Sequence, residues 1–371
     1  MAVTDFGSLS ETQKKVWSAE TWQEGRDQSF WFSKGFIGKS QKDMNSPIHR
    51  VTDLTETDRG LSCVMQLIAD LQGDGVVGDN ELEGNEESLV NDVQEIRIDQ
   101  LRNGAKSKGR MAEQATVVRF RAMARGKLTF WLSEKIDELM FLTAAGRAFT
   151  LNTDGSTRSG SQLPGLTFAA DVVAASTNRI RYGGDATSEA TLVAADTMTW
   201  TVVKNASAFA KRKKIKPIRQ GGKEYYALVL STEQARDLKG DSNYININKD
   251  GGARGTKNPL FTGALAVVDG VIIHEHNKVF NTLGATSGSA KWGAGSDVDG
   301  AQAMLFGAQA MGLALIGSTS MDESDNSDYG NRQGLSWGRK LGMLKPQFQS
   351  RPDSNATEDF GIVSIKTAAA E

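Results

Sequence analysis

The segment from Gly60 to Gly104 constrains the fold more than any other part of the chain. Residues 60–71 (GLSCVMQLIADL) are mostly apolar, and residues 93–104 (VQEIRIDQLRNG) alternate between apolar and polar side chains, so each run has the pattern of a β-strand. Residues 72–92 between them contain no Lys or Arg, and their carboxylates are Asp74, Asp79, Glu81, Glu83, Glu86, Glu87 and Asp92. We therefore predict an extended hairpin with a flexible acidic tip, which cannot bury its own faces.

The acidic tip also contains the spacing Gly73-x-Gly75-x-x-Gly78, which is typical of a dinucleotide-binding turn. Such a site needs a helix N-terminus directly after the glycines, where free N–H groups meet a pyrophosphate. Here Asp79 and Glu81 follow instead, and a like-charged pair at ~4 Å costs about 1–4 kcal/mol in semi-aqueous surroundings. We predict no cofactor, which places an oxidoreductase third among the function classes.

Composition limits the remaining classes. The chain has 371 residues, enough for one large or two medium domains, and its formal net charge of −2 creates no global field toward nucleic acid or membranes. The single cysteine, Cys63, excludes an intramolecular disulfide and predicts a reducing compartment. No run approaches the ~20 apolar residues of a membrane span, and the N-terminal residues lack the pattern of a signal peptide. We predict a soluble protein made inside the cell, with no membrane partner.

Catalytic signatures are absent from the sequence. It contains no GxSxG, HExxH, CxxC or GxxxxGK[ST] motif and has three histidines. Two of them, His274 and His276, lie in a strand-like run and could face one side, but a metal site needs further ligands. We predict polar positions at a strand end, no catalytic or metal-binding residues, and no enzymatic activity.

A long helix is predicted from Met111 to Ala145. Its apolar stripe repeats at a spacing of three to four residues through Leu128, Leu132, Ile136 and Leu139. A helix of this length spans about 50 Å, more than a compact domain requires. The length indicates a structural spine.

A second helix is predicted after Asp196, its expected N-cap, and it runs into a basic segment at residues 211–219. The cations of this basic run are Lys211, Arg212, Lys213, Lys214, Lys216 and Arg219. Cations favour a helix C-terminus, and a basic run can also contact phosphates. Both interpretations stay open, so a nucleic-acid-binding protein that uses residues 211–219 is the alternative function.

The remaining segments alternate between strands and helices. A strand at 224–231 precedes a short helix capped by Ser231 or Thr232, with Gln234 at the capping-box position, and Asp269-Gly270 predicts a hairpin. Residues 301–317 predict a small-residue helix, and 360–366 a final strand. Residues 1–52 read as an arm with a short helix from Glu11 to Gly25, whose aromatic residues pack either on a neighbouring subunit or back on the same chain.

The order of these parts resembles the Hong Kong 97-type fold of tailed-phage major capsid proteins, and several stretches are similar to the coliphage N-four-type capsid family. The stretches are GDGVVGDNELEGNEE, IRIDQLRNGAKSKGRMAEQ, RIRYGGDATS, YYALVLSTEQARDLKGD, NPLFTGALAVVDGVIIHEH, LFGAQAMGLA, DYGNRQGLSWGRKLGM and DFGIVSIKTAA. They occur in the family's order over most of residues 60–371.

The resemblance implies an α+β chain in five parts. These are an N-terminal arm (1–52), an E-loop hairpin (53–109), a P-domain with the spine helix (110–222), an A-domain (223–345) and a C-terminal P-domain strand (346–371). Some capsids of this fold join subunits through a Lys–Asn bond, but no motif here carries such residues over, so we predict no covalent cross-link.

The resemblance also implies a function: self-assembly into the icosahedral shell that encloses the double-stranded DNA of a tailed phage. The implied partners are the chain itself as hexamers and pentamers, a decoration or cement protein, a portal, a scaffold, and packaged DNA through weak non-specific contact. The protein would be made in the cytoplasm of a bacterial host and reside in the virion. We predict that the acidic tip meets Lys106, Lys108 and Arg110 of a neighbour, or a cement protein, and that the run 211–219 is the candidate surface facing DNA.

Overall fold

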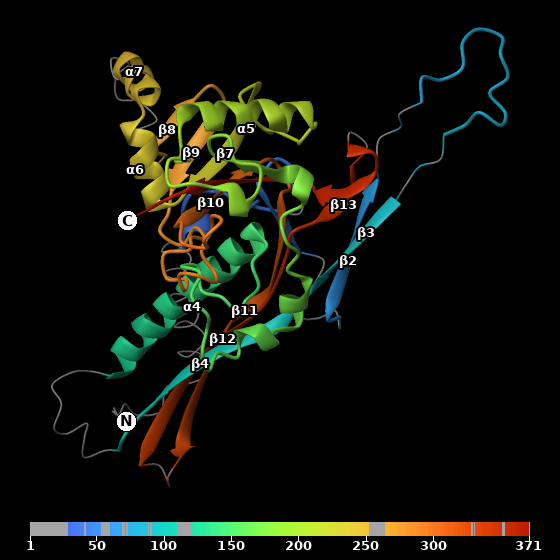
Figure 1. Ribbon diagram of the computed structural model, residues 1–371. Helices are drawn as coiled ribbons and strands as arrows, with labels where there is room; N and C mark the ends of the chain where they lie inside the picture. Colours follow the sequence, from blue (N-terminus) through green and yellow to red (C-terminus); the bar gives the residue numbers. More distant parts are fainter. Residues whose placement is uncertain are drawn as a thin grey trace.

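The computed structural model is a mixed α+β protein built on two β-sheets (Figure 1). It describes residues 29–40, 42–52, 60–68, 71, 73–87, 89, 91–109, 120–251, 264–327, 329, 331–350 and 353–370. The helix predicted at 11–25, the first nine residues of the predicted spine helix, and Arg110 lie outside these residues.

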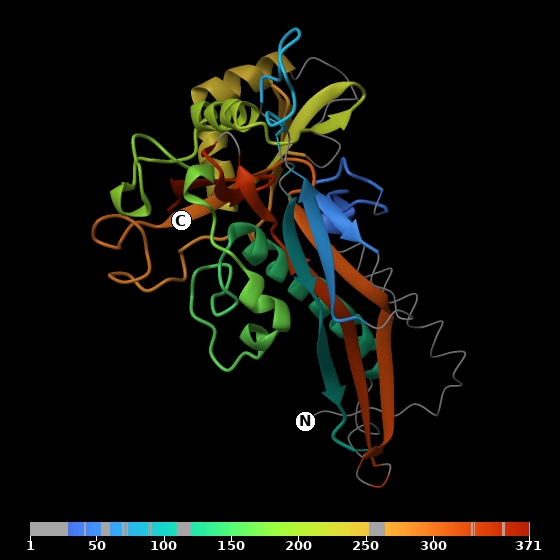
Figure 2. The same ribbon diagram turned by 90° about the vertical axis from the view of Figure 1, so that its right-hand side faces the viewer.

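The first sheet has four strands in the order β1-β11-β12-β4 and runs along the lower body (Figures 1 and 2). Its strands are β1 (Ile48–Val51), β11 (Met311–Ser327), β12 (Arg332–Leu344) and β4 (Asp99–Lys106). β1 pairs with β11 in parallel, whereas the other pairs are antiparallel. Within the described part of the chain, β4 is therefore an edge strand.

The second sheet has seven strands, in the order β5-β15-β10-β7-β9-β8 with β6 paired to β7. The strands are β5 (Ile180–Tyr182), β6 (Ile218–Gln220), β7 (Lys223–Leu230), β8 (Ala266–Val268), β9 (Val271–Glu275), β10 (Gly300–Phe306) and β15 (Ile362–Ala368). The helices around it are α5 (Trp200–Arg212), α6 (Thr232–Gly240) and α7 (Ser242–Gly251). Single-turn helices precede and follow β5: η1 (Leu163–Gly165), η2 (Thr167–Asp171), η3 (Thr177–Arg179) and η4 (Glu189–Thr191).

Helix α4 (Phe120–Ala145) packs against β12, β10 and β4 and forms the spine of the body. The predicted stripe is confirmed, because Leu128, Leu132, Ile136 and Leu139 are all buried. The helix ends before Gly146, which has a φ of +67°. A Cβ at this position would lie 2.4 Å from the Val173 carbonyl oxygen. Both the backbone conformation and the lack of space therefore require glycine here.

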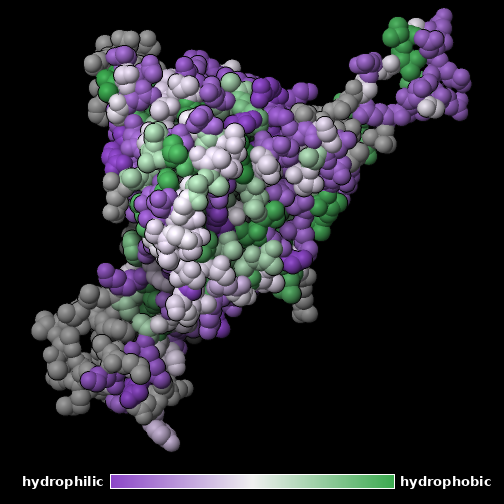
Figure 3. All heavy atoms as spheres, in the orientation of Figure 1, coloured by the Kyte–Doolittle hydropathy of each residue, from purple (hydrophilic) through white to green (hydrophobic). Residues whose placement is uncertain are grey.

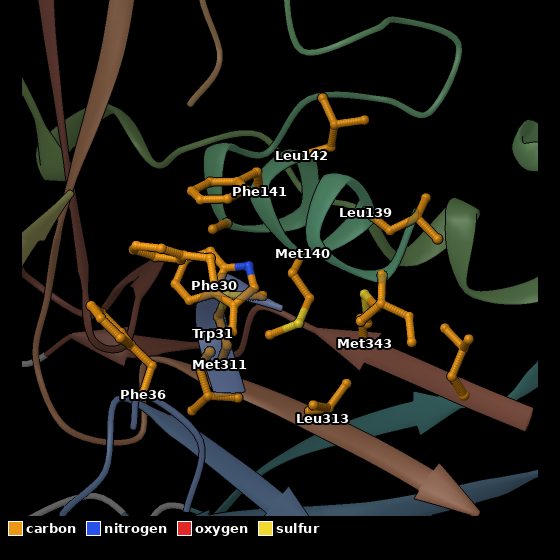
Figure 4. Close-up of a cluster of buried hydrophobic side chains, with 14 of the residues drawn as sticks. Phe30, Trp31, Phe36, Leu139, Met140, Phe141, Leu142, Met311, Leu313 and Met343 are labelled. Atoms are coloured by element: carbon orange, nitrogen blue, oxygen red, sulfur yellow. The ribbon is translucent and has the colours of Figure 1, made fainter. Parts of the chain in front are cut away.

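An N-terminal aromatic segment completes the core between α4 and β11 (Figure 4). Helix α2 (Phe30–Ser33) buries the side chains of Phe30 and Trp31 against Phe141, and the buried Phe36 ring packs on both of them. Of the two interpretations of the aromatic arm, packing on the same chain is therefore confirmed for residues 29–36. Burial of these large rings contributes much of the core's hydrophobic stabilisation.

Several local predictions are confirmed. Ser231 caps α6, where its Oγ accepts a hydrogen bond from the Gln234 amide at 3.2 Å, while the Gln234 side-chain oxygen accepts one from the Ser231 amide at 3.2 Å. Asp269 and Gly270 join β8 to β9 with φ of +53° and +78°, the conformation of a tight hairpin turn.

Two local predictions are wrong. Residues 301–317 form β10 and the start of β11 rather than a helix. β10 lies between β15 and β7 and is buried on both faces. Its apolar run therefore lacks the alternation of apolar and polar residues by which a half-exposed strand is predicted. Asp196 does not cap α5, which begins at Trp200. The Trp200 amide instead donates to the carboxylate of Asp241 at 2.7 Å, so a residue distant in sequence takes the capping role.

The two sheets do not divide the chain at the predicted part boundaries. β11 and β12, predicted in the A-domain segment 223–345, pair with β1 and β4, while β15 of the C-terminal segment pairs with β10. The division of the chain into five parts remains a prediction. No helix among the described residues is long and apolar enough to cross a membrane.

Candidate intersubunit surface

The predicted hairpin is present and projects from the body (Figure 1). Strands β2 (Ser62–Ile68) and β3 (Asn91–Arg97) pair antiparallel as a separate two-stranded sheet, and residues 71–89 continue away from the body at the upper end. The second predicted arm is shorter than expected, because residues 99–104 belong to β4 and pair with β12. The chain thus passes from the hairpin into the body sheet at Ile98.

The root of the hairpin is fixed to the body. Ile96 and Ile98 join a small buried cluster with Ala314, Ile316 and Leu344. Polar contacts add to it: the Gln349 amide donates to the Asp92 carboxylate at 2.7 Å, and the Arg97 guanidinium lies 3.5 Å from the Asp171 carboxylate. These contacts fix the orientation of the hairpin relative to the body.

The outward face of the hairpin carries uncovered apolar side chains among polar ones. Val64, Ile68 and Val93 are each more than half exposed, and Leu61 at the root is 80% exposed. Apolar side chains grouped in this way on a projecting element mark an interaction surface, because a monomeric fold would bury them. An isolated two-stranded hairpin is also marginally stable in water.

All six predicted acidic residues of the tip that precede Leu89 are exposed. The tip stands out as a hydrophilic projection in Figure 3. The Glu87 carboxylate accepts a hydrogen bond from the Gly73 amide at 2.5 Å and the Glu86 carboxylate one from the Gly84 amide at 2.7 Å, so two carboxylates fold the tip locally. Gly75 and Gly78 have φ of +74° and +67° in an irregular segment with no following helix, which removes the basis of a nucleotide site.

The predicted basic partners lie at the other end of the molecule. Lys106 ends β4 and Lys108 follows it, both exposed, while Arg110 lies outside the described residues. In both ribbon views, β4 runs toward the lower end and the tip lies at the upper end (Figures 1 and 2). The tip and these lysines of one subunit therefore do not meet.

The basic run 211–219 is partly engaged inside the subunit. Lys213 forms an ion pair with Asp353, Lys216 donates to Gln309 at 2.7 Å, and Arg219 lies 3.3 Å from Glu224. The other three members, which are exposed and take no part in these contacts, are Lys211, Arg212 and Lys214. Half of the run thus makes ion pairs or hydrogen bonds inside the subunit at and after the end of α5.

A groove of about 860 Å³ that sequence reasoning missed lies beside the edge strand β4. Its large apolar lining residues are Leu101, Trp131, Leu163 and Leu166, and its basic ones are Arg102, Lys135 and Arg158. These residues come from β4, α4 and the 152–166 segment, which are separated in sequence and carry no common motif. No sequence signal could have joined them.

The two histidines of the strand-like run are packed among aromatic rings. The His276 ring stacks on Phe141 at 4.9 Å and lies 4.6 Å from Phe30, and burial lowers its pKa to about 4. His274 lies 5.2 Å from Phe36. Among the described residues, no cluster of three or more His, Cys, Asp or Glu side chains could hold a metal ion.

A buried carboxylate ties the aromatic segment to the spine helix. Asp137 on α4 accepts hydrogen bonds from the Ser29 hydroxyl at 2.5 Å and the Phe30 amide at 2.8 Å. Burial raises the pKa of Asp137 to about 6, against the lowering effect of these hydrogen bonds and of Lys278. The carboxylate is thus a structural contact and faces no open site.

Comparison with known proteins yields relatives over the whole chain. The model of a family described as phage capsid protein matches residues 5–371. The major capsid protein of Pseudomonas phage KPP25 is 43% identical over 376 residues, covering 99% of this chain and 98% of the relative. The solved capsid of Ralstonia phage GP4 has a TM-score of 0.76 at 29% identity, over 93% of this chain and 92% of that one. The capsid of cyanophage Pam1 shares the fold with a TM-score of 0.70 at 21% identity, over 100% and 96% of the two chains.

Proposed function

This chain belongs to the phage capsid protein family, and from that premise we propose how its copies form the shell of a phage head. It is a structural virion component, a major capsid protein, and the fold and function that the sequence resemblance implied are confirmed. The observation that carries the proposal is the hairpin β2–β3, whose exposed apolar side chains Val64, Ile68 and Val93 have no cover within the described part of the subunit. A neighbouring copy supplies that cover, so folding of the hairpin and assembly of the shell are coupled.

We further propose that the contact runs head to tail. The acidic residues of the tip and the cations Lys106, Lys108 and Arg110 attract each other, yet the described tip and lysines lie at opposite ends of one subunit (Figure 1). Such a contact joins two different surfaces of neighbouring copies. Repetition of the contact produces a closed ring when the rotation from one copy to the next divides a full turn evenly. In this proposal the closed rings are the hexamers and pentamers of an icosahedral shell.

The finer partners belong to the same proposal. Three exposed members of the run 211–219, Lys211, Arg212 and Lys214, provide a surface for weak, non-specific contact with packaged double-stranded DNA. A cement protein, a portal and a scaffold would bind to the assembled rings, and synthesis would take place in the cytoplasm of the bacterial host. The alternative of a dedicated nucleic-acid-binding protein finds no support in the relatives, and three cations of its run are already engaged internally.

The experiment is assembly of the purified full-length chain across a salt series, scored by electron microscopy. We expect closed particles at low and moderate salt and fewer at high salt, because exposed charge pairs are screened. The variant Glu81→Gln with Glu83→Gln weakens assembly, whereas the matched pair Asp185→Asn with Asp269→Asn, exposed carboxylates outside the tip, leaves it unchanged. Only monomers or small discrete oligomers under every condition would contradict a shell.

A further inference from the structure

Three cations from two parts of the chain surround the ring of Phe209 on α5. The guanidinium carbon of Arg181, a residue of β5, lies 3.6 Å from the ring centroid, that of Arg212 lies 5.6 Å from it, and the Lys213 ammonium 5.9 Å. We propose that Arg181 and Arg212 hold one phosphate group of the packaged DNA backbone between them. This phosphate site rests on the DNA contact proposed above and adds Arg181, which lies outside the predicted basic run 211–219.

The nearby carboxylate of Asp353 is already engaged. It forms ion pairs with Lys213 and Arg179, both within the subunit. Asp353 also attracts the Arg181 guanidinium, but neither Arg181 nor Arg212 forms an ion pair or hydrogen bond with any residue that the structure describes. Two positive charges beside this ring are therefore left without an anionic partner.

The two guanidinium groups are close enough to repel each other. Burial and, after it, the charge of Arg212 lower the pKa of Arg181. The Phe209 ring attracts both cations and holds them in place, but it does not neutralise them. A phosphate between the two planar guanidinium groups would relieve the repulsion and accept charge-assisted hydrogen bonds from both.

Other arginines of the described residues have carboxylate partners. Four that each form an ion pair are Arg147, Arg158, Arg219 and Arg236. Arg147 also lies over a ring, that of Phe280, at 4.6 Å, but the Glu189 carboxylate lies 2.7 Å from its guanidinium. Stacking on a ring alone thus has a structural explanation. The Phe209 site differs because it gathers two arginines that no carboxylate neutralises.

Positive charge continues along the outer face of α5, which lies across the upper body (Figure 1). Lys204 and Lys211 are exposed and seven residues apart, so they lie on one side of the helix, about 10 Å apart along its axis. Exposed Lys214 follows the helix. Because each DNA strand carries a phosphate about every 3.4 Å of helix axis, a row of this length can contact several phosphates of one backbone.

The acidic tip of another copy matches this surface less well than DNA does. Val77 is 78% exposed and Leu82 is 58% exposed among the carboxylates of the tip, and a partner of the tip has to cover them. The exposed residues of α5 have no large apolar side chain; they are Thr201, Lys204, Asn205, Ala208, Lys211 and Arg212. A sugar–phosphate backbone needs no apolar cover, so the charges of α5 favour DNA.

Binding of a short fluorescent DNA duplex to the unassembled full-length chain tests the site. Anisotropy is measured over a salt series, at protein concentrations at which light scattering detects no particles. Arg181→Gln should raise the Kd about tenfold and lower the slope of log Kd against log salt by about 1, because a phosphate contact is lost. The matched control Lys127→Gln, which removes an exposed cation of α4, should change neither.

Two results of this measurement overturn the site. One is equal duplex binding by Arg181→Gln and Lys127→Gln, and the other is no binding by the unsubstituted chain even at low salt. Arg212 is exposed, so Arg212→Gln gives the same readout if Arg181→Gln fails to fold.

A double substitution tests whether the two arginines share one phosphate. Bound phosphate relieves the repulsion between Arg181 and Arg212, and either single substitution already removes that repulsion. Arg181→Gln with Arg212→Gln should therefore raise the Kd by less than the product of the two single factors, whereas Arg181→Gln with Lys204→Gln should give the full product. A full product for the arginine pair contradicts a shared phosphate.

Inorganic phosphate separates a DNA site from a site for small anions. When it replaces sodium chloride at equal ionic strength, it should raise the urea midpoint of the unsubstituted chain more than that of Arg212→Gln. Equal rises contradict a phosphate site. A larger rise in the unsubstituted chain, together with equal duplex binding by Arg181→Gln and Lys127→Gln, assigns a small-anion site and overturns the DNA partner.

Failure of the phosphate site is distinguishable from failure of the shell function. Formation of particles by the unsubstituted chain is scored separately by electron microscopy. Absence of particles overturns the shell function, whereas equal duplex binding by the variants overturns the phosphate site alone.

Discussion

The acidic tip and the buried charges beneath the β13–β14 hairpin use the same residue types in opposite ways. In the tip, exposed carboxylates lie on an irregular loop that extends away from the body of the subunit (Figure 1). Beneath β13 (Gln347–Ser350) and β14 (Ala356–Asp359), the Lys345 ammonium lies 3.1 Å from the Asp359 carboxylate with both side chains fully buried. Arg179 and Lys213 both contact Asp353 in the same region.

The buried charges stabilise the subunit itself, whereas the exposed carboxylates of the tip are available to a neighbouring copy. A buried ion is tolerated only when it is paired, because its desolvation would otherwise cost several kcal/mol. An exposed carboxylate keeps its water and costs the subunit nothing. Contacts between copies should therefore involve charged side chains that form no ion pair within the subunit.

The largest expected effect is on the buried pair. Lys345→Ala leaves the Asp359 carboxylate buried without its cation and should lower the free energy of unfolding by about 3–5 kcal/mol, measured by urea titration of the unassembled subunit. Lys239→Ala, which removes an exposed partner of Glu275, is the control and should cost less than about 1 kcal/mol. Equal effects of the two substitutions would show that the buried pair contributes no more to stability than an exposed one.

A smaller effect should appear in the pH dependence of stability around the aromatic segment. The raised pKa of Asp137, about 6, means that its stabilising contribution is present at low pH and lost as pH rises through 6. The lowered pKa of His276, about 4, means that its contribution is present above pH 6.5 and lost as pH falls through 4. The two contributions oppose each other between pH 4 and 6.5.

Single substitutions should separate these contributions. Relative to the unsubstituted chain, Asp137→Asn should lose additional stability between pH 7 and pH 5, and His276→Phe should gain stability over the same interval, each on the order of 1–2 kcal/mol. Urea titrations at the two pH values measure both. If the stability of both variants changed with pH in the same way, neither group would control how stably residues 29–36 pack on the body.

The smallest effect on the subunit should come from the tip itself. Replacing Asp79, Glu81 and Glu83 with Asn or Gln should leave the urea midpoint of the unassembled chain unchanged, because these exposed side chains have no role in the core. The same variant should shift the onset of assembly to higher protein concentration, measured by light scattering. A lowered urea midpoint would show that the carboxylates of the tip stabilise the subunit itself.

The sequence by itself determined the elements whose signals are local. The apolar run of β2, the acidic loop, the stripe of α4 and the capping box at Ser231 each depend on neighbours within a few residues, so their periodicity and turn chemistry were sufficient. The order of its motifs also identified the capsid family. These features survive in the fold because no distant contact opposes them.

Only the tertiary structure decided the features that depend on distant partners. Residues 301–317 became strands because β15 and β7 pair with β10 on both sides, and Asp241 replaced Asp196 at the start of α5. The groove beside β4 exists because Trp131, Arg158 and Leu166 converge from segments separated in sequence. The physical reason is the same in each case: pairing and burial across the fold outweigh local propensity, and a sequence pattern does not record them.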